Sequence, residues 1–487
     1  MGNTLKNIKI PYPTEGVIRS AQLNDTVTPE NSVQLAVNMN FDRVGAITTR
    51  NGISTYATSL SGSVTSFGTL NSQASSTKYL FAQVGTAIKA LNSSTGAWAT
   101  VRTATVTTKA RFSQFLNRTW MVNGNAGDAP KTSNGGTFDT TDVPATFPKA
   151  DFIEAGYEGR VWVADASKDI LYYTDIVQST NGTTYISPLT FDLTTNFITK
   201  FSPQDGESIT GLFRVPKALL LFKQNHIYRV YNTANVDPYP AYNVGTFSQE
   251  SIVQAKDGVY FHHSSGFYKF AYDTQPTEIS RRVIDFVKAI PRSSYENIVG
   301  VYDGYDAVKW SVGSITVEGV TYANCQMRYS ISTQVWTIYD FAGNNITALI
   351  RYDNGTSIDQ IAGTSTGLVG KLDSGTTDFG SDIYYEIIDR WRSFTDMYAQ
   401  TKNISGMMVM TENGAGMELQ YRTEKTPENK WEYIDSVKNR YDALFPNAST
   451  DDFNNVQLRL RGNTKGTPVI YHGTEILSLQ IKGFEEN

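Results

Sequence analysis

Short apolar runs, each closed by turn-forming residues, follow one another along most of this sequence, and their spacing limits the chain to a few folds. The stretch 209–231 shows the unit most plainly. An apolar run at 209–213 is followed by a turn with Pro216, a second run at 219–222, a polar turn and a final strand. This pattern predicts a β-meander.

Similar meanders, never identical in sequence, recur from residue 53 to residue 375. The clearest set has four expected strands, at 298–302, 307–312, 321–329 and 335–339. Repetition of small sheets at a spacing of about 45 residues is typical of a β-propeller. The number of sets predicts about six or seven blades.

Composition favours an all-β chain. Aromatic residues make up 12 % of it and charged residues 18 %, and 38 glycines and 16 prolines punctuate it at short intervals. We expect only two brief helices. One follows the N-cap signal Thr28-Pro29-Glu30 and includes Val33, Leu35, Ala36 and Val37, and the other spans 282–289.

Changes in composition and in the length of the expected strands predict three parts of the chain. Residues 1–52 read as an N-terminal arm with the short helix, and residues 53–375 as the propeller. Longer alternating strands from residue 381 to residue 487 predict a β-sandwich-like module, and a final enlarged blade is the less favoured alternative. Small polar residues at 374–377 predict a linker.

Charge and hydropathy exclude several classes of partner. The formal net charge is −5, which argues against general attraction to nucleic acid or to an anionic membrane. No run of 18 apolar residues is present, and the first residues lack the apolar core of a signal peptide. With the single Cys325, these features predict a protein made and assembled in a reducing cytoplasm, with no membrane partner.

No catalytic or cofactor site is predicted. His262 and His263 are neighbours in an expected strand, so their side chains point to opposite faces and need a carboxylate from another blade to form a metal site. The acidic turns 165–169 and 303–306 lack the spacing of a calcium loop, and Cys325 is expected to be buried. Phosphate-loop, serine-hydrolase and zinc-protease motifs are absent from the sequence.

A short motif precedes the meanders. It reads N-x-x-F-D-x-x-G-x-x-x-x-R-x-G and consists of the following residues: Asn38, Phe41, Asp42, Gly45, Arg50 and Gly52. With the order of elements after it, the motif resembles the tail hub or nozzle proteins of short-tailed phages, of the packaged-DNA stabilisation type. Taken alone, it also fits an ordinary turn, with glycines where positive φ is needed.

The resemblance implies a structural virion protein of the phage tail, assembled in the host cytoplasm, without enzymatic activity. In that family several copies, usually six, form a ring that extends the portal channel and retains the packaged DNA. Its partners are the portal or adaptor proteins, tail fibres or a needle, and DNA passing through without sequence-specific binding. We expect the long loops 123–146 and 175–200 to supply ring contacts or a channel gate.

A second hypothesis is a carbohydrate-binding or glycan-cleaving propeller on a virion or cell surface. The tyrosine and tryptophan content would serve it. The turn at 94–98 resembles the aspartate box of sialidases, but Thr95 stands where the aspartate is needed. A cytoplasmic scaffold of the WD or kelch kind lacks its signature in each blade.

Overall fold

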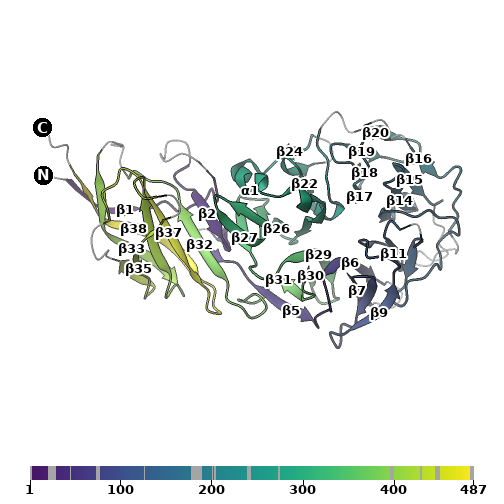
Figure 1. Cartoon of the computed structure of the whole chain (residues 1–487), viewed down its shortest axis with the longest axis horizontal. Coiled ribbons are helices and arrows are strands. Elements are labelled where there is room, and N and C mark those ends of the chain that lie inside the picture. The colour runs from purple at the N-terminus through teal and green to yellow at the C-terminus, as the bar shows by residue number, and fades with distance from the viewer. Residues whose placement is uncertain are drawn as a thin grey trace.

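A computed structural model shows a ring of small sheets joined to a two-layer β module (Figure 1). Both termini lie at the end of the module that is farthest from the ring (Figure 1). The structure describes residues 3–19, 29–43, 45–72, 77–125, 127–176, 189–199, 201, 205–238, 243–271, 275–394, 400–427, 430–444 and 450–482. The all-β class and the propeller with an additional β module are confirmed.

Seven antiparallel blades, counted over the described residues, form the ring, and we number them in chain order. Six of them are separate small sheets, and blade 6 is part of a larger sheet. Blade 1 contains β6 (Val64–Asn71), β7 (Lys78–Val84), β8 (Ala87–Leu91) and β9 (Trp98–Thr103). Blade 2 contains β10 (Arg111–Phe115), β11 (Arg118–Val122) and β12 (Lys131–Ser133). Blade 3 contains β13 (Phe152–Ala155), β14 (Val161–Asp165), β15 (Ile170–Tyr173) and β16 (Phe197–Ile198). Blade 4 contains β17 (Gly211–Val215), β18 (Ala218–Phe222), β19 (Ile227–Val230) and β20 (Val236–Pro238). Blade 5 contains β21 (Val253–Ala255), β22 (Gly258–His263), β23 (Gly266–Phe270) and β24 (Thr277–Glu278). Blade 6 contains β25 (Val299–Tyr302), β26 (Ala307–Val317), β27 (Val320–Ser330) and β28 (Trp336–Asp340). Blade 7 contains β29 (Ile346–Asp353), β30 (Ile358–Thr364), β31 (Val369–Leu372) and β5 (Ile53–Ala57).

Blade 7 closes the ring, because its outer strand β5 comes from the start of the propeller and pairs with β31 from its end. The first strands of most neighbouring blades contact one another, and between blades 4 and 5 β17 contacts η2 (Gln249–Ser251), which precedes β21, so these strands lie around the central axis. Between blades the packing is apolar on both sides. In β18, Leu219 and Leu221 pack toward blade 3, whereas Leu220 and Phe222 pack toward blade 5. This explains why β18 reads as a continuous apolar run.

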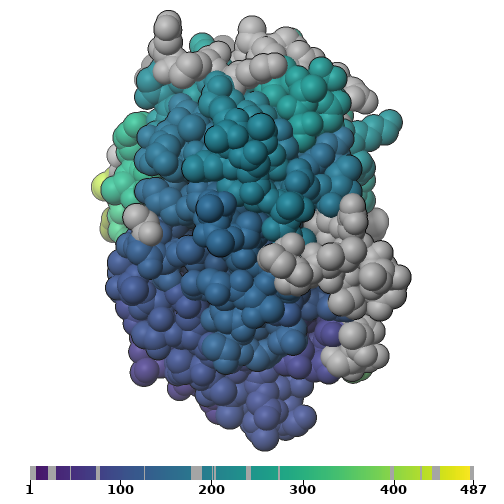
Figure 2. Space-filling model, turned by 90° about the vertical axis from the view of Figure 1, so that its right-hand side faces the viewer, coloured from purple at the N-terminus to yellow at the C-terminus, as the bar shows by residue number. Residues whose placement is uncertain are grey.

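Figure 2 turns the flank of the ring farthest from the module toward the viewer. The chain of the early and middle blades, coloured blue to teal, covers it (Figure 2). Of the two predicted loops, 123–146 contains the short strand β12, so the structure corrects its reading as a loop throughout. Within 175–200, residues 177–188 lie outside the described residues, and β16 occupies Phe197–Ile198.

The helix predicted over 282–289 is present as η3 (Arg281–Val283) and α1 (Ile284–Lys288). The other short helical turns are η1 (Tyr157–Gly159), η2 (Gln249–Ser251) and η4 (Arg292–Asn297). No helix in the described part of the chain is long and apolar enough to cross a membrane.

The helix predicted after Thr28-Pro29-Glu30 was wrong, because residues 33–37 form the strand β2 (Val33–Val37). Ser32 donates its backbone N–H and its hydroxyl to the carbonyl of Pro29, so the capping signal forms a turn instead. β2 then pairs with β28 on one side and β32 on the other. Tertiary pairing overrides the local helical signal in this segment.

The module is built from both ends of the chain. Its N-terminal strands are β1 (Asn3–Lys9), β2, β3 (Met39–Arg43) and β4 (Ala46–Thr49). Its C-terminal strands are β32 (Tyr384–Asp389), β33 (Lys402–Glu412), β34 (Glu418–Thr423), β35 (Glu432–Ser436), β36 (Tyr441–Leu444), β37 (Val456–Asn463) and β38 (Ile470–Ile481). One layer has the order β3-β4-β38-β33-β36, with β1 also paired to β38.

The other layer is continuous with the propeller. In a nine-stranded sheet, β25 to β28 of blade 6 are followed by β2, β32, β37, β34 and β35. The N-terminal residues are therefore not a separate arm, and this part of the sequence interpretation is corrected. Local patterns cannot show such pairing, since β1 and β38 lie at opposite ends of the sequence.

Candidate functional site

The motif residues meet where the propeller joins the module, and buried Arg50 lies at the centre of this joint. Its guanidinium contacts both carboxylate oxygens of Asp378, at 2.8 and 2.5 Å. Its Nε donates to Oδ1 of Asn38 at 2.7 Å, and its cationic carbon lies 4.1 Å from the centre of the Phe341 ring. A bidentate, buried ion pair of this kind fixes the geometry of the groups that it joins.

Asn38 occupies the corner at which the chain passes from one layer of the module to the other. It separates β2 from β3 and has a φ of 55°, a left-handed conformation that asparagine tolerates better than most residues. Its Nδ2 donates to the carbonyls of Tyr384 (2.7 Å) and Asp340 (3.1 Å), and its Oδ1 accepts the N–H of Asp340. The side chain thus connects blade 6 with the first strand after the linker.

Gly52 is required by close packing of two backbones. A Cβ atom built on it would lie 1.9 Å from the carbonyl oxygen of Thr377. Its N–H donates to the carbonyl of Gly375, and its own carbonyl accepts from Ser374. The chain entering the propeller and the chain leaving it are therefore in direct contact.

The other motif residues surround the joint. Both Asp42 oxygens lie 3.0 Å from Nη2 of Arg328 in blade 6, and Phe41 belongs to the large core shared by module and propeller. Gly45 has a φ of 78° in the turn between β3 and β4, and no atom lies within 4 Å of the position that a Cβ atom would take there. The ordinary-turn interpretation fits Gly45, whereas the other residues make long-range contacts.

Sequence reasoning missed the partners of Arg50. Asp378 lies among small polar residues that predicted only a linker, and Phe341 follows an unremarkable strand. The buried arginine carries no local signal of its partner, because 328 residues separate it from Asp378. In the described part of the chain, the contacts of the joint fix the propeller to the module.

The central channel of the propeller is crossed by charged side chains. Arg111 at the start of blade 2 contacts Glu250, which precedes blade 5, with 3.0 Å between Nε and Oε1. Because these blades are three positions apart in the ring, the pair spans the channel. Lys109 lies 3.6 Å from the same carboxylate. Burial raises the Glu250 pKa, but Arg111 and Lys109 outweigh it and hold the pKa at about 2.

Glu154 on β13 is a second glutamate near the channel axis, with the opposite behaviour. Desolvation raises its pKa to about 7, and Arg214 and Ser113 offset this only in part. The distance between its Oε1 and Ser113 Oγ is 3.4 Å. A raised pKa suits a general acid or base, but no second reactive group faces Glu154 among the contacts found in the described chain.

His262 and His263, which are successive residues of β22, form no metal site with each other. His226 does lie beside Asp205 and Glu207, and one ligand atom from each falls within 4.8 Å of the others. Lys223 Nζ lies 2.9 Å from Asp205, so the buried ammonium already compensates the charge of one of the three candidate ligands. His226 Nδ1 lies 3.2 Å from Glu207.

The remaining sequence candidates are structural. Burial lowers the pKa of His262 to about 3 and that of His263 to about 4, so both are neutral at pH 7. Cys325 is buried in the core, and burial raises its thiol pKa. In the acidic turns, Asp303 accepts three backbone N–H groups and Asp306 contacts Lys256.

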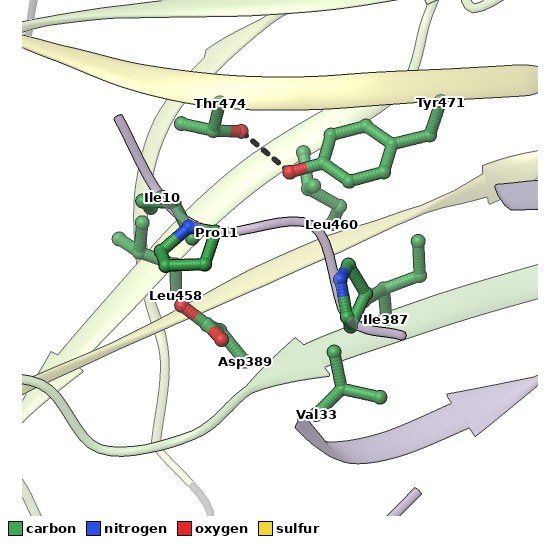
Figure 3. A pocket seen from close by; sticks show the side chains of 10 residues that line it. Ile10, Pro11, Val33, Ile387, Asp389, Leu458, Leu460, Tyr471 and Thr474 are labelled. Atoms are coloured by element: carbon green, nitrogen blue, oxygen red, sulfur yellow. Dashed lines mark hydrogen bonds between the residues drawn. The ribbon is translucent and has the colours of Figure 1, made fainter. Parts of the chain in front are cut away.

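Figure 3 shows a cavity between the two layers of the module, closed on one side by Ile10 and Pro11 of the N-terminal chain. Its volume is about 20 Å³, enough for one water molecule. Tyr471 and Thr474 share a hydrogen bond of 2.9 Å at its wall (Figure 3). The cavity is a small packing gap with no room for a substrate.

Comparisons with known proteins support the fold alone. No protein-family model matches the sequence, and no curated protein matches it. A streptogramin B lyase structure is 15 % identical over 66 % of this chain and 97 % of that chain, with a TM-score of 0.45. Virginiamycin B lyase from Staphylococcus aureus is 14 % identical over 64 % of this chain and 94 % of that chain, with a TM-score of 0.42. A structure of YCF48 bound to D1 peptide is 9 % identical over 68 % of this chain and 96 % of that chain, with a TM-score of 0.40.

These structures are β-propeller proteins, like this chain. At such identities and TM-scores, the likeness says nothing about ligand or reaction. Any function proposed for the chain therefore rests on its own geometry.

Proposed function

We propose that this chain is a non-enzymatic structural protein of a phage tail, a hub or nozzle subunit whose copies form a ring around a DNA channel. The observation that carries the proposal is the joint at Arg50. Four of the motif residues, Asn38, Asp42, Arg50 and Gly52, make contacts there that lock a propeller and a two-layer module into one body. A subunit that retains DNA under pressure needs this rigidity.

The charged side chains that cross the central channel of the propeller also support the proposal. With Arg111 and Glu250 in contact across the axis, the pore of the single propeller is not a path for DNA. The conduit must then lie between copies, which requires a ring. The net charge of −5 suits passage of DNA without adhesion.

The test is the mass of the purified chain by light scattering, followed by electron microscopy of the particle. We expect a ring with a central hole and a mass near six times 53.9 kDa. A stable monomer that binds an array of glycans would contradict the proposal and favour the carbohydrate-binding alternative. Partners above and below the ring are proposed to be portal or adaptor proteins and fibres or a needle.

A further inference from the structure

A groove lies on the outer face of the nine-stranded sheet, where blade 6 continues into the module. Alternation along β32 turns Tyr385 and Ile387 toward the core, so Glu386 and Ile388 point to the opposite face and line the groove. Lining residues also come from β2 and β37, which Figure 1 shows on either side of β32. The groove has a volume of about 130 Å³, close to that of a cavity of about 150 Å³ that accommodates benzene.

The tip of the β26–β27 hairpin forms one wall of the groove. β28 pairs with residues 325–329 of β27, so the tip extends past the end of β28. Val320 and Tyr322 line the groove from this tip, and Leu35 and Ile388 add apolar surface from the sheet. These walls suit a ligand with a short carbon body better than a fully hydrated ion.

Three arginines, Arg19, Arg422 and Arg459, line the groove from three separate segments of the chain. Glu318 and Glu386 are the acidic residues of its described lining, so three positive charges meet two negative ones and the formal net charge is +1. The whole chain has a net charge of −5, so the groove is a positive site on an acidic protein. A guanidinium group matches the planar geometry of a carboxylate, with which it forms paired hydrogen bonds.

Arg422 and Arg459 are ordered by contacts within the sheet. Nε of Arg422 donates to Oε1 of Gln457 at 2.7 Å. Nε of Arg459 lies 2.5 Å from Oε1 of Glu386. The cationic carbons of the two arginines lie 4.8 and 5.3 Å from the centre of the Trp431 ring. An arginine that is already ordered loses less conformational entropy when it binds a carboxylate.

Arg19 brings a buried charge whose nearest partner is exposed. Its side chain is 5 % exposed, and its Nη2 lies 2.6 Å from Glu318, which is 64 % exposed. Its Nε makes no hydrogen bond within the described residues, and the carboxylate of Asp285 lies 4.0 Å from it. Since buried polar groups are normally hydrogen-bonded, a further acceptor beside this guanidinium stabilises it.

We propose that this groove binds a small organic acid, whose carboxylate pairs with the arginines and whose carbon body contacts the apolar wall. A free acid and the acidic side chain of a partner protein present the same chemistry, and the experiment separates these two sources. The inference goes beyond the proposed tail function and does not depend on a ring.

The experiment measures binding to the full-length chain by isothermal titration calorimetry. Succinate is the free acid, and glutamate capped at both its amino and its α-carboxyl group represents an acidic side chain. We expect saturable binding of at least one of them, and the tighter of the two identifies the source. Succinamide, the neutral analogue of succinate, is expected to bind about tenfold more weakly or less, because it forms no charged pair with arginine.

Variants of the lining locate the bound acid. Arg19→Gln and Arg422→Gln each remove a guanidinium, and we expect each to weaken binding by about tenfold or more. Val320→Trp narrows the groove without a change of charge, and Val320 is 48 % exposed, so the larger side chain does not disturb the core. Arg440→Gln is the matched control and is expected to bind as wild type does, because Arg440 is exposed and does not line the groove.

Circular dichroism and melting curves verify that each variant folds. A folded wild-type chain that binds neither acid would overturn the proposal. Binding that is unchanged in folded Arg422→Gln and Val320→Trp variants would overturn it as well, since the acid would then lie elsewhere. Inorganic phosphate that binds as tightly as succinate would contradict the assignment to a carboxylic acid. A wild-type ring that binds no acid leaves the tail function standing, and a monomer that binds the acid leaves the groove standing.

Discussion

The propeller and the module are both β structures, but the chain builds them in opposite ways. In the propeller, the strands pair with their sequence neighbours, as in the hairpin that joins Val215 to Ala218, except for β5, which pairs with β31. In the module, Asn3 pairs with Ile481. Local hairpins have low loop-closure cost, whereas the module requires contacts across nearly the whole chain. This difference indicates that the module depends on the propeller to bring its N-terminal and C-terminal strands together.

The largest effect is expected when the propeller and the module are produced as separate fragments. We expect a fragment of residues 53–375 to retain its sheets, because the strands of the small sheets pair inside that range. A fragment of residues 376–487 is expected to stay unfolded, because it lacks β1 to β4. Circular dichroism and amide hydrogen exchange measure both.

A fusion of residues 1–52 to 376–487 through a flexible linker serves as the control and is expected to regain structure. Cooperative unfolding of the 376–487 fragment on its own would show that the module does not need the N-terminal strands.

The next largest effect is expected from Arg50→Met at the joint. This change leaves Asp378 buried without its partner and lowers the free energy of unfolding by about 3–5 kcal/mol. Urea denaturation measures it, and two separate transitions are expected in place of one. Adding Asp378→Leu to the variant restores part of the loss, since the uncompensated charge is gone.

The control for Arg50 is Arg440→Met, because Arg440 is 60 % exposed in its pair with Glu412. We expect it to cost about 0–1 kcal/mol. Equal losses in the two variants would mean that the joint is no more important than a surface ion pair.

Glu250→Gln removes a long-range contact inside the propeller, because Glu250 and Arg111 join blades that are not neighbours in the ring. The folded pKa of Glu250 is about 2, below the ordinary 4.5, so its stabilisation is present above pH 4.5 and is lost as the pH falls toward 2. We expect the variant to be less stable than wild type by about 2–3 kcal/mol at pH 7. The difference should shrink toward acid in denaturation curves recorded at several pH values.

Glu296→Gln is the matched control, since the side chain of Glu296 is exposed. A Glu250 variant whose stability difference is the same at pH 3 and pH 7 would contradict the cross-channel ion pair.

The smallest effect is expected from Gly52→Ala. The added methyl group would meet the backbone of Thr377, which cannot move as a side chain does. We expect a loss of about 1–3 kcal/mol in thermal or urea unfolding. Gly343→Ala is the control, because no atom lies within 4 Å of its Cβ position, and a change within about 0.5 kcal/mol is expected. A neutral Gly52 variant would show that the two chains at the joint can separate.

The propeller was predictable because its information is local. Turn residues such as those at 223–225 and 264–265 stand between apolar runs, and hairpins form between neighbours. The short strand β12 was missed because three polar residues carry no alternation. The strand β2 was misread as a helix, because the capping signal before it is local and its two partner strands are far away.

The candidate joint was predictable in part. The motif that resembles the phage tail family includes Asn38, Arg50 and Gly52, but the sequence did not indicate that these residues meet at a joint, and their partners stayed hidden. Asp378 and Asp340 become neighbours of Arg50 only after the ring has closed and the chain has returned to its start. The membership of residues 1–52 in the module was hidden for the same reason.

By itself, the sequence determined the all-β class and the repeated meanders, because alternation and turn chemistry act between residues close in the chain. Only the tertiary structure decided that blade 6 continues into the module, that charges cross the channel, and that Arg50 finds Asp378. These features depend on which distant segments meet, and that outcome is set by the closure of the whole ring.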